Sequence, residues 1–157
     1  MLLSLFQTLE ASAIGEAVRN SLWLFPVVEA FHLIGLAIIG GAVLVVDFRL
    51  LGLGLRDHPL ARLARAMQPW VIGSLLLMIV SGIPLFLSEA IKCYYSFAFW
   101  TKMTALVLAV LFTFTIRRRV SFAAEGRFSP MSRRAVGLAS IGLWSTVGWG
   151  GRWIGFS

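Results

Sequence analysis

The sequence predicts an all-α integral membrane protein, a four-helix bundle preceded by an N-terminal amphipathic helix at the membrane interface. Two observations lead to this fold class. Hydrophobic residues make up 59% of the 157 residues and charged residues 13%, about half the share of roughly 25% in soluble domains. The apolar residues form four long runs, and two of the links between these runs are rich in arginine. A chain with so little polar surface requires lipid as part of its solvent.

One N-terminal segment and four apolar runs are the expected elements, in chain order. Residues 2–19 place Leu5 and Leu9 at helical spacing, which predicts the amphipathic interfacial helix. Each later run supplies the ~20 residues that cross ~30 Å of hydrocarbon at 1.5 Å per residue. We take residues 1–157 as one mature membrane domain, because the first basic residue, Arg19, comes too late for a cleavable signal peptide. The expected spans are residues 21–46, 69–87, 99–116 and 135–156.

Prolines and the single cysteine predict local features. Asp57 suits a helix N-cap and Pro59 a first turn, so we expect a short separate helix over residues 59–67. Pro84, near the end of the second span, predicts a kink or an early stop. Cys93 stands alone, which excludes an intramolecular disulfide and a cysteine-rich metal site.

Lysines and arginines predict how the bundle faces. The positive-inside rule places arginine-rich links in the cytoplasm, so both termini are expected outside a bacterial inner membrane. The short basic clusters in this chain of net charge +7 suit membrane orientation better than a nucleic-acid partner. The arginines of the two rich links are Arg56, Arg62, Arg65, Arg117, Arg118, Arg119, Arg127, Arg133 and Arg134.

Ionisable residues at membrane depth carry most of the functional information, because one such charge costs about 2.5–3.5 kcal/mol to insert. Glu29 and His32 are three residues apart on one helical face, roughly 12 and 16 Å below the outer surface. Glu89, Lys102 and Arg152 fall in the same outer half on the other spans. These five residues predict an outward-facing polar site for an ion, a metal or a small polar ligand. His32 beside Glu29 would be the metal ligands.

The same charges also fit a purely structural interpretation. Pairing Glu29 with Lys102 or Arg152, and Glu89 with the other cation, would lock the helices together without any ligand.

Asp47 and Arg49, at the inner end of the first span, have an expected role in anchoring. They are two residues apart and point to different sides of a helix. Each is therefore expected to bond a neighbouring helix or the lipid headgroups.

Several stretches resemble a known family. S-L-W-L-F-P-V-V-E-A-F-H-L-I-G-L and V-V-D-F-R-L-L-G-L are similar to the opening of an uncharacterised family of small bacterial four-helix membrane proteins. M-Q-P-W, S-G-I-P-L-F-L-S-E-A-I-K and F-W-T-K-M extend this resemblance over nearly the whole chain. It implies the fold and the membrane location. A weaker likeness to membrane proteins of the copper-resistance D type implies a metal. The matching positions are Glu29, His32, Asp47, Arg49, Glu89, Lys102 and Arg152.

Three classes of function stay open, and an enzyme is the weakest class because no catalytic motif is present. The first is transport or binding of an ion, metal or small polar ligand, in an oligomer because one four-helix unit has little room for a pore. The second is a b-type haem or quinone-linked electron-transfer subunit with His32 as axial ligand; the other histidine, His58, falls in a cytoplasmic link. The third is an accessory subunit without a ligand. Expected partners are membrane lipid and a second copy or a membrane or periplasmic protein.

Overall fold

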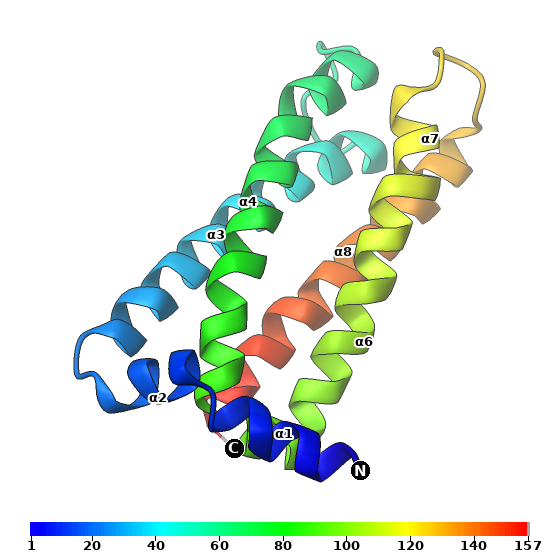
Figure 1. Ribbon diagram of the computed structural model, residues 1–157. Coiled ribbons are helices and arrows are strands. Elements are labelled where there is room, and N and C mark those ends of the chain that lie inside the picture. Colours follow the sequence, from blue (N-terminus) through cyan, green and yellow to red (C-terminus); the bar gives the residue numbers. More distant parts are fainter. Residues whose placement is uncertain (157) are drawn as a thin grey trace.

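The computed structural model describes residues 1–156. These residues form helices joined by short loops, with no strand among them, which confirms the all-α prediction (Figure 1). The elements are α1 (Leu2–Glu10), α2 (Ala13–Asn20), α3 (Leu24–Leu51), α4 (Leu60–Ser88), α5 (Ala90–Tyr95), α6 (Phe97–Phe112), the π-helical turn η1 (Thr113–Arg117), α7 (Arg118–Phe122) and α8 (Pro130–Ile154).

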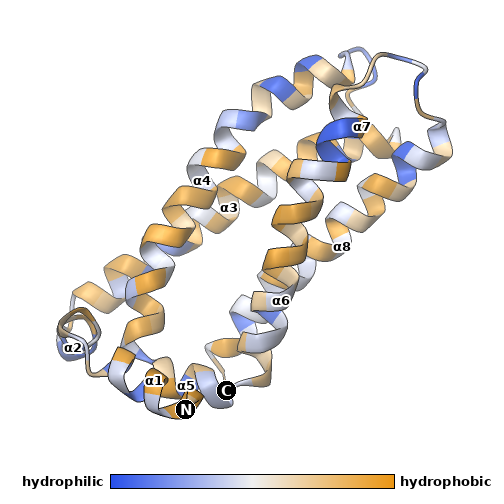
Figure 2. Ribbon diagram, turned by 45° about the vertical axis from the view of Figure 1, so that its right-hand side comes forward, coloured by the Kyte–Doolittle hydropathy of each residue, from blue (hydrophilic) through white to orange (hydrophobic). Residues whose placement is uncertain are grey.

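The bundle has two chemically different ends (Figures 1 and 2). We call one the terminal end, because α1, α2, α5 and both chain termini lie there. The other, which we call the arginine end, holds the loops at residues 52–59 and 123–129. Apolar residues dominate the long helices between the two ends.

Three helical stretches within residues 1–156 are long and apolar enough to cross a membrane: Leu24–Leu51, Leu60–Ser88 and Phe97–Phe122. Many of their large apolar side chains are exposed, as lipid-facing surfaces require. These features support a membrane protein. The fourth expected span lies in α8, which is not among the three; it carries arginines near both of its ends and packs along α6 and α3.

The helices pack in the order α4, α3, α8, α6. α3 has its most extensive contacts with α4 and also packs on α8, while α6 packs on α8. α6, η1 and α7 follow one another without a loop, and α4 contacts this continuous stretch at the arginine end, through α7. The core between these helices is apolar and is formed by Ile39, Ala42, Val43, Val71, Met78, Ala105, Ala109, Trp144 and Val147.

The N-terminal segment is two helices, where residues 2–19 were expected to form one. Ser12 lies outside helical geometry, and its Oγ accepts the N–H of Gly15 at 3.2 Å, which caps α2. The turn brings Glu10 within 3.2 Å of Arg19 and lets Phe6 pack against α5. The sequence pattern shows the apolar faces of this segment but not the break between them.

Helix α4, which contains the second expected span, is also longer than expected. Residues 59–67 do not form a separate helix, because α4 begins at Leu60 and continues through Pro69 and Pro84 to Ser88. Membrane helices tolerate proline where neighbouring hydroxyl groups bond the freed carbonyls. The carbonyls freed in α4 are those of Arg65 and Val80, four residues before each proline, whereas its serine hydroxyls donate to other carbonyls, as Ser74 does to Trp70 O at 2.6 Å.

Candidate functional site

His32 is an ionisable group inside the half of the bundle nearer the terminal end. Its ring is half-buried between α3 and α4, with Nδ1 2.9 Å from Oγ of Ser81. The ring lies against Gly82, where an added Cβ would come within 3.2 Å of His32 Cε1. Because Ser81 occupies Nδ1, Nε2 is the nitrogen left for a ligand.

Lys102 is the second ionisable group of this region. It is half-buried on α6, and its aliphatic chain lies along α8, where Gly150 and Gly151 have no side chains to obstruct it. A Cβ on Gly151 would sit 3.4 Å from the lysine Nζ. Lys102 interacts electrostatically with His32, and no carboxylate within residues 1–156 forms an ion pair with it. This region therefore holds a positive charge within electrostatic range of an imidazole.

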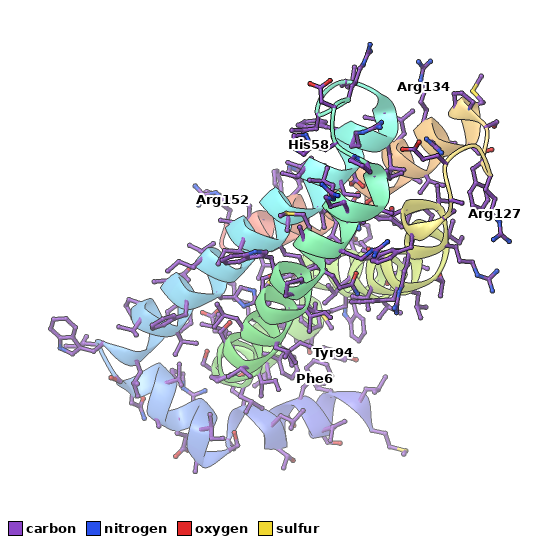
Figure 3. The ribbon with its side chains drawn as sticks, turned by 90° about the horizontal axis from the view of Figure 1, so that it is seen from above. Phe6, His58, Tyr94, Arg127, Arg134 and Arg152 are labelled. Carbon is purple, nitrogen blue, oxygen red and sulfur yellow. The ribbon has the colours of Figure 1, made fainter. Side chains whose placement is uncertain are left out.

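The other three residues of the expected cluster form no ion pair with Lys102 or His32 within residues 1–156. Glu29 is exposed on α3 and forms no ion pair in the part of the chain that the structure describes. Glu89 ends α4 and lies 3.9 Å from Lys92, with both side chains about 40% exposed. Arg152 projects away from the bundle, over the ring of Phe156 at 5.1 Å (Figure 3). The expected locking pairs are accordingly not formed among residues 1–156.

Metal ligands are also not grouped. The described residues contain no set of three or more histidine, cysteine or acidic side chains arranged to hold a metal ion. Cys93 is buried in α5, at the terminal end. Burial, helped by the nearby Glu89 carboxylate, raises the pKa of this thiol to about 11. Cys93 therefore stays protonated at neutral pH, where it is a poor nucleophile and metal ligand.

A buried ion pair in the half of the bundle nearer the arginine end was not predicted from the sequence. Arg117 Nε donates to Asp47 Oδ1 at 2.8 Å, with the side chains 8% and 0% exposed. The same guanidinium donates to Val43 O at 3.1 Å, so it joins η1 to α3 twice. Asp47 thus bonds a neighbouring helix, whereas Arg49 donates to His58 O at 3.0 Å and holds the loop after α3.

The π-helical turn explains why Arg117 faces inward. Residues Thr113–Arg117 form η1, which puts one extra residue into the turn and rotates the rest of the rod relative to a continuous α-helix. Arg117 is consequently buried, whereas the next two arginines, Arg118 and Arg119, are exposed. Near it, Trp144 Nε1 donates to Thr113 Oγ1 at 3.1 Å, across α8 and η1.

Some polar atoms around the ion pair have no partner. Asp47 Oδ2, Ser121 Oγ and Ser140 Oγ are buried without a hydrogen bond, although Ser140 lies close enough to Asp47 to interact with it. A crevice of about 10 Å³ reaches Arg117 between α4 and η1. That volume matches about one water molecule.

One signal in the sequence could have identified Ser81 as the partner of His32. Serines at positions 74, 81 and 88 are seven residues apart, and all three are buried on α4. Seven residues make almost two helical turns, so these hydroxyls share one face. No comparable pattern marks Arg117.

Comparisons with known proteins place the chain in a family. Residues 6–157 match the family described as "Family of unknown function (DUF6644)". Neither the curated proteins nor the solved structures include a match. The family match covers nearly the whole chain, and it confirms the resemblance to an uncharacterised family that the sequence motifs indicated. The chain therefore belongs to the DUF6644 family of unknown function.

Proposed function

We propose that this protein binds or transports a small polar ligand in the outer half of a bacterial inner membrane, at a site formed by His32 and Lys102. The observation that carries the proposal is a half-buried lysine within electrostatic range of an imidazole held by Ser81, with no carboxylate in the described chain in an ion pair with that lysine. An intramembrane cation costs several kcal/mol unless something compensates it. A ligand that binds there would supply this compensation.

The polar groups at the site favour one ligand chemistry. Ser81 Oγ donates to Leu77 O at 2.7 Å, so it accepts the Nδ1–H of His32 and leaves Nε2 of the neutral ring as an acceptor. The Lys102 ammonium is the donor, and it suits an acceptor oxygen such as a carboxylate or a quinone carbonyl. A metal ion would be repelled by the ammonium. We therefore favour an anionic or carbonyl-bearing small molecule over a metal.

The proposed orientation depends on the charges at the two ends. The positive-inside rule supports placing the arginine end in the cytoplasm, which puts His32 and Lys102 nearer the outside. The ligand would then enter from the periplasmic side.

Ligand-induced stabilisation tests the proposal. Purified protein is titrated with decylubiquinone and, separately, with sodium benzoate while thermal unfolding is followed. A ligand at about 100 times its Kd stabilises by about 2.7 kcal/mol, which raises Tm by roughly 5–10 °C for a chain of this size. Lys102→Met should abolish the shift. Lys92→Met, which removes an exposed lysine at the same end, should leave it unchanged.

Two results would contradict this assignment. One is a Tm that neither probe changes in the wild type. The other is a shift that survives both Lys102→Met and His32→Ala, because the ligand would then bind elsewhere.

A b-type haem is the second candidate, and the bond between His32 Nδ1 and Ser81 favours it. Iron-ligating histidines usually have their other ring nitrogen fixed in this way. An absorption spectrum of purified protein supplemented with haem tests the idea. A Soret band that His32→Ala removes would support haem, whereas a spectrum of free haem in both proteins would exclude it.

A further inference from the structure

A groove at the arginine end gathers positive charge outside the His32 site. The end of α3 and the start of α8 enclose about 340 Å³ there. Arg49, Arg133 and Arg134 line this groove, and no acidic residue does. Arginine is the side chain best suited to phosphate, because its planar donors bind two oxygens at once. The charge and volume therefore suit an anionic ligand.

The three guanidinium groups are held in different ways. Arg49 uses Nε to donate to His58 O at 3.0 Å, which positions its end group. Arg133 has a buried Nε with no hydrogen-bond partner. Arg134 is exposed and extends away from α8 (Figure 3).

Helix dipoles do not cancel this charge. The start of α8, capped by Ser129, contributes about +0.5 of an elementary charge, and the end of α3 about −0.5. These two partial charges offset each other where both helix ends line the groove. Three full positive charges remain.

The apolar part of the groove indicates which phosphate compound fits. Leu50, Leu51 and Phe128 line it beside the arginines. Next to lining residues in the chain, Leu53 and Met131 are 73% and 76% exposed. These positions lie at one end of α3, a helix long and apolar enough to cross a membrane, and headgroups meet acyl chains at the ends of such helices. Soluble phosphate would gain nothing from this apolar surface, whereas a phospholipid uses both parts.

We propose that this groove binds the phosphate group of an anionic phospholipid in the leaflet at the arginine end. The guanidinium groups of Arg133 and Arg134 bind the phosphate oxygens, and Arg49 closes the site from α3. The lipid thereby bridges the end of α3 and the start of α8. This proposal does not depend on the ligand proposed for His32 and Lys102.

Native mass spectrometry of the detergent-purified protein tests the proposal, with dioleoyl phosphatidylglycerol as the probe and dioleoyl phosphatidylcholine as the reference lipid. Arg133→Gln with Arg134→Gln should weaken phosphatidylglycerol binding by at least about tenfold, as expected for losing charge-assisted hydrogen bonds. The matched control is Arg119→Gln with Arg127→Gln, which removes two exposed arginines of the same end that do not line the groove. It should change the affinity by less than about threefold.

Several results would overturn the proposal. Equal losses in the two double variants would show nonspecific attraction to a basic surface, and equal binding of the two lipids would show no anion selectivity. Displacement of phosphatidylglycerol by millimolar sodium phosphate would identify soluble phosphate as the ligand.

A second variant keeps the test informative if the glutamine variant does not fold. Arg133→Lys with Arg134→Lys retains both charges but loses the two-pronged geometry of each guanidinium. It should bind phosphatidylglycerol more weakly than the wild type with an unchanged far-ultraviolet circular dichroism spectrum. Wild-type affinity in this lysine variant would contradict a built phosphate site.

Discussion

Breaking the Asp47–Arg117 ion pair is expected to be among the most destabilising single changes in this protein. The pair is buried, with the Asp47 side chain 0% exposed and Nε and Oδ1 2.8 Å apart. Removing one member leaves the other as an uncompensated buried charge, which costs about 3–5 kcal/mol. Arg117→Met also removes the bond to Val43 O. For a chain of 157 residues, this loss lowers Tm by roughly 6–20 °C.

A double-mutant cycle in detergent measures the pair itself. The single variants are Asp47→Leu and Arg117→Met, and the double variant combines them. Replacing a whole buried ion pair with apolar side chains is often neutral or stabilising by about 1–4 kcal/mol. The double variant should therefore be more stable than either single variant. Arg118→Met, at the neighbouring exposed position, should change stability by less than about 1 kcal/mol.

Additive stability losses from Asp47→Leu and Arg117→Met would refute this reasoning. If the two losses simply sum in the double variant, the coupling energy is zero and the two groups do not interact in the folded protein. A loss from Arg117→Met no larger than that from Arg118→Met would show that Arg117 is not buried.

Three further predictions concern Cys93 and two tightly packed glycines. Because its thiol pKa is raised from 9.0 to about 11, folded Cys93 has about a hundredfold less thiolate at pH 8 than unfolded chain, so maleimide should label it slowly. Gly15→Ala should lower Tm by several degrees, since its Cβ would lie 2.5 Å from Leu87 O. Gly82→Ala should weaken ligand binding at His32 more than it lowers Tm, because its Cβ would press on the ring at 3.2 Å.

Matched controls make these three measurements decisive. Gly54→Ala and Gly73→Ala are the glycine controls, since an added Cβ meets nothing within 4 Å at either position. Equal Tm losses at Gly15 and Gly54, or equal binding losses at Gly82 and Gly73, would contradict the packing. Rapid labelling of native Cys93 at pH 8 would show that the thiol is not buried.

The amino-acid sequence alone specifies the environment of this protein and the nature of its elements. Hydropathy adds up along a chain, so long apolar runs predict membrane-crossing helices whatever their neighbours are. The same local logic places His32 and Lys102 in one half of the bundle, because depth can be counted in residues along each helix. It also separates an arginine-rich end from the end that holds the termini.

Which charges meet is settled by the packing of the helices. Depth in the membrane says nothing about rotation around the helix axis, which is set by contacts with neighbouring helices. Glu29 therefore faces outward although it lies one turn from His32. Asp47 meets Arg117 across 70 residues because the π-helical turn rotates that arginine inward. Such a turn depends on long-range contacts, and a 3.6-residue periodicity cannot reveal it.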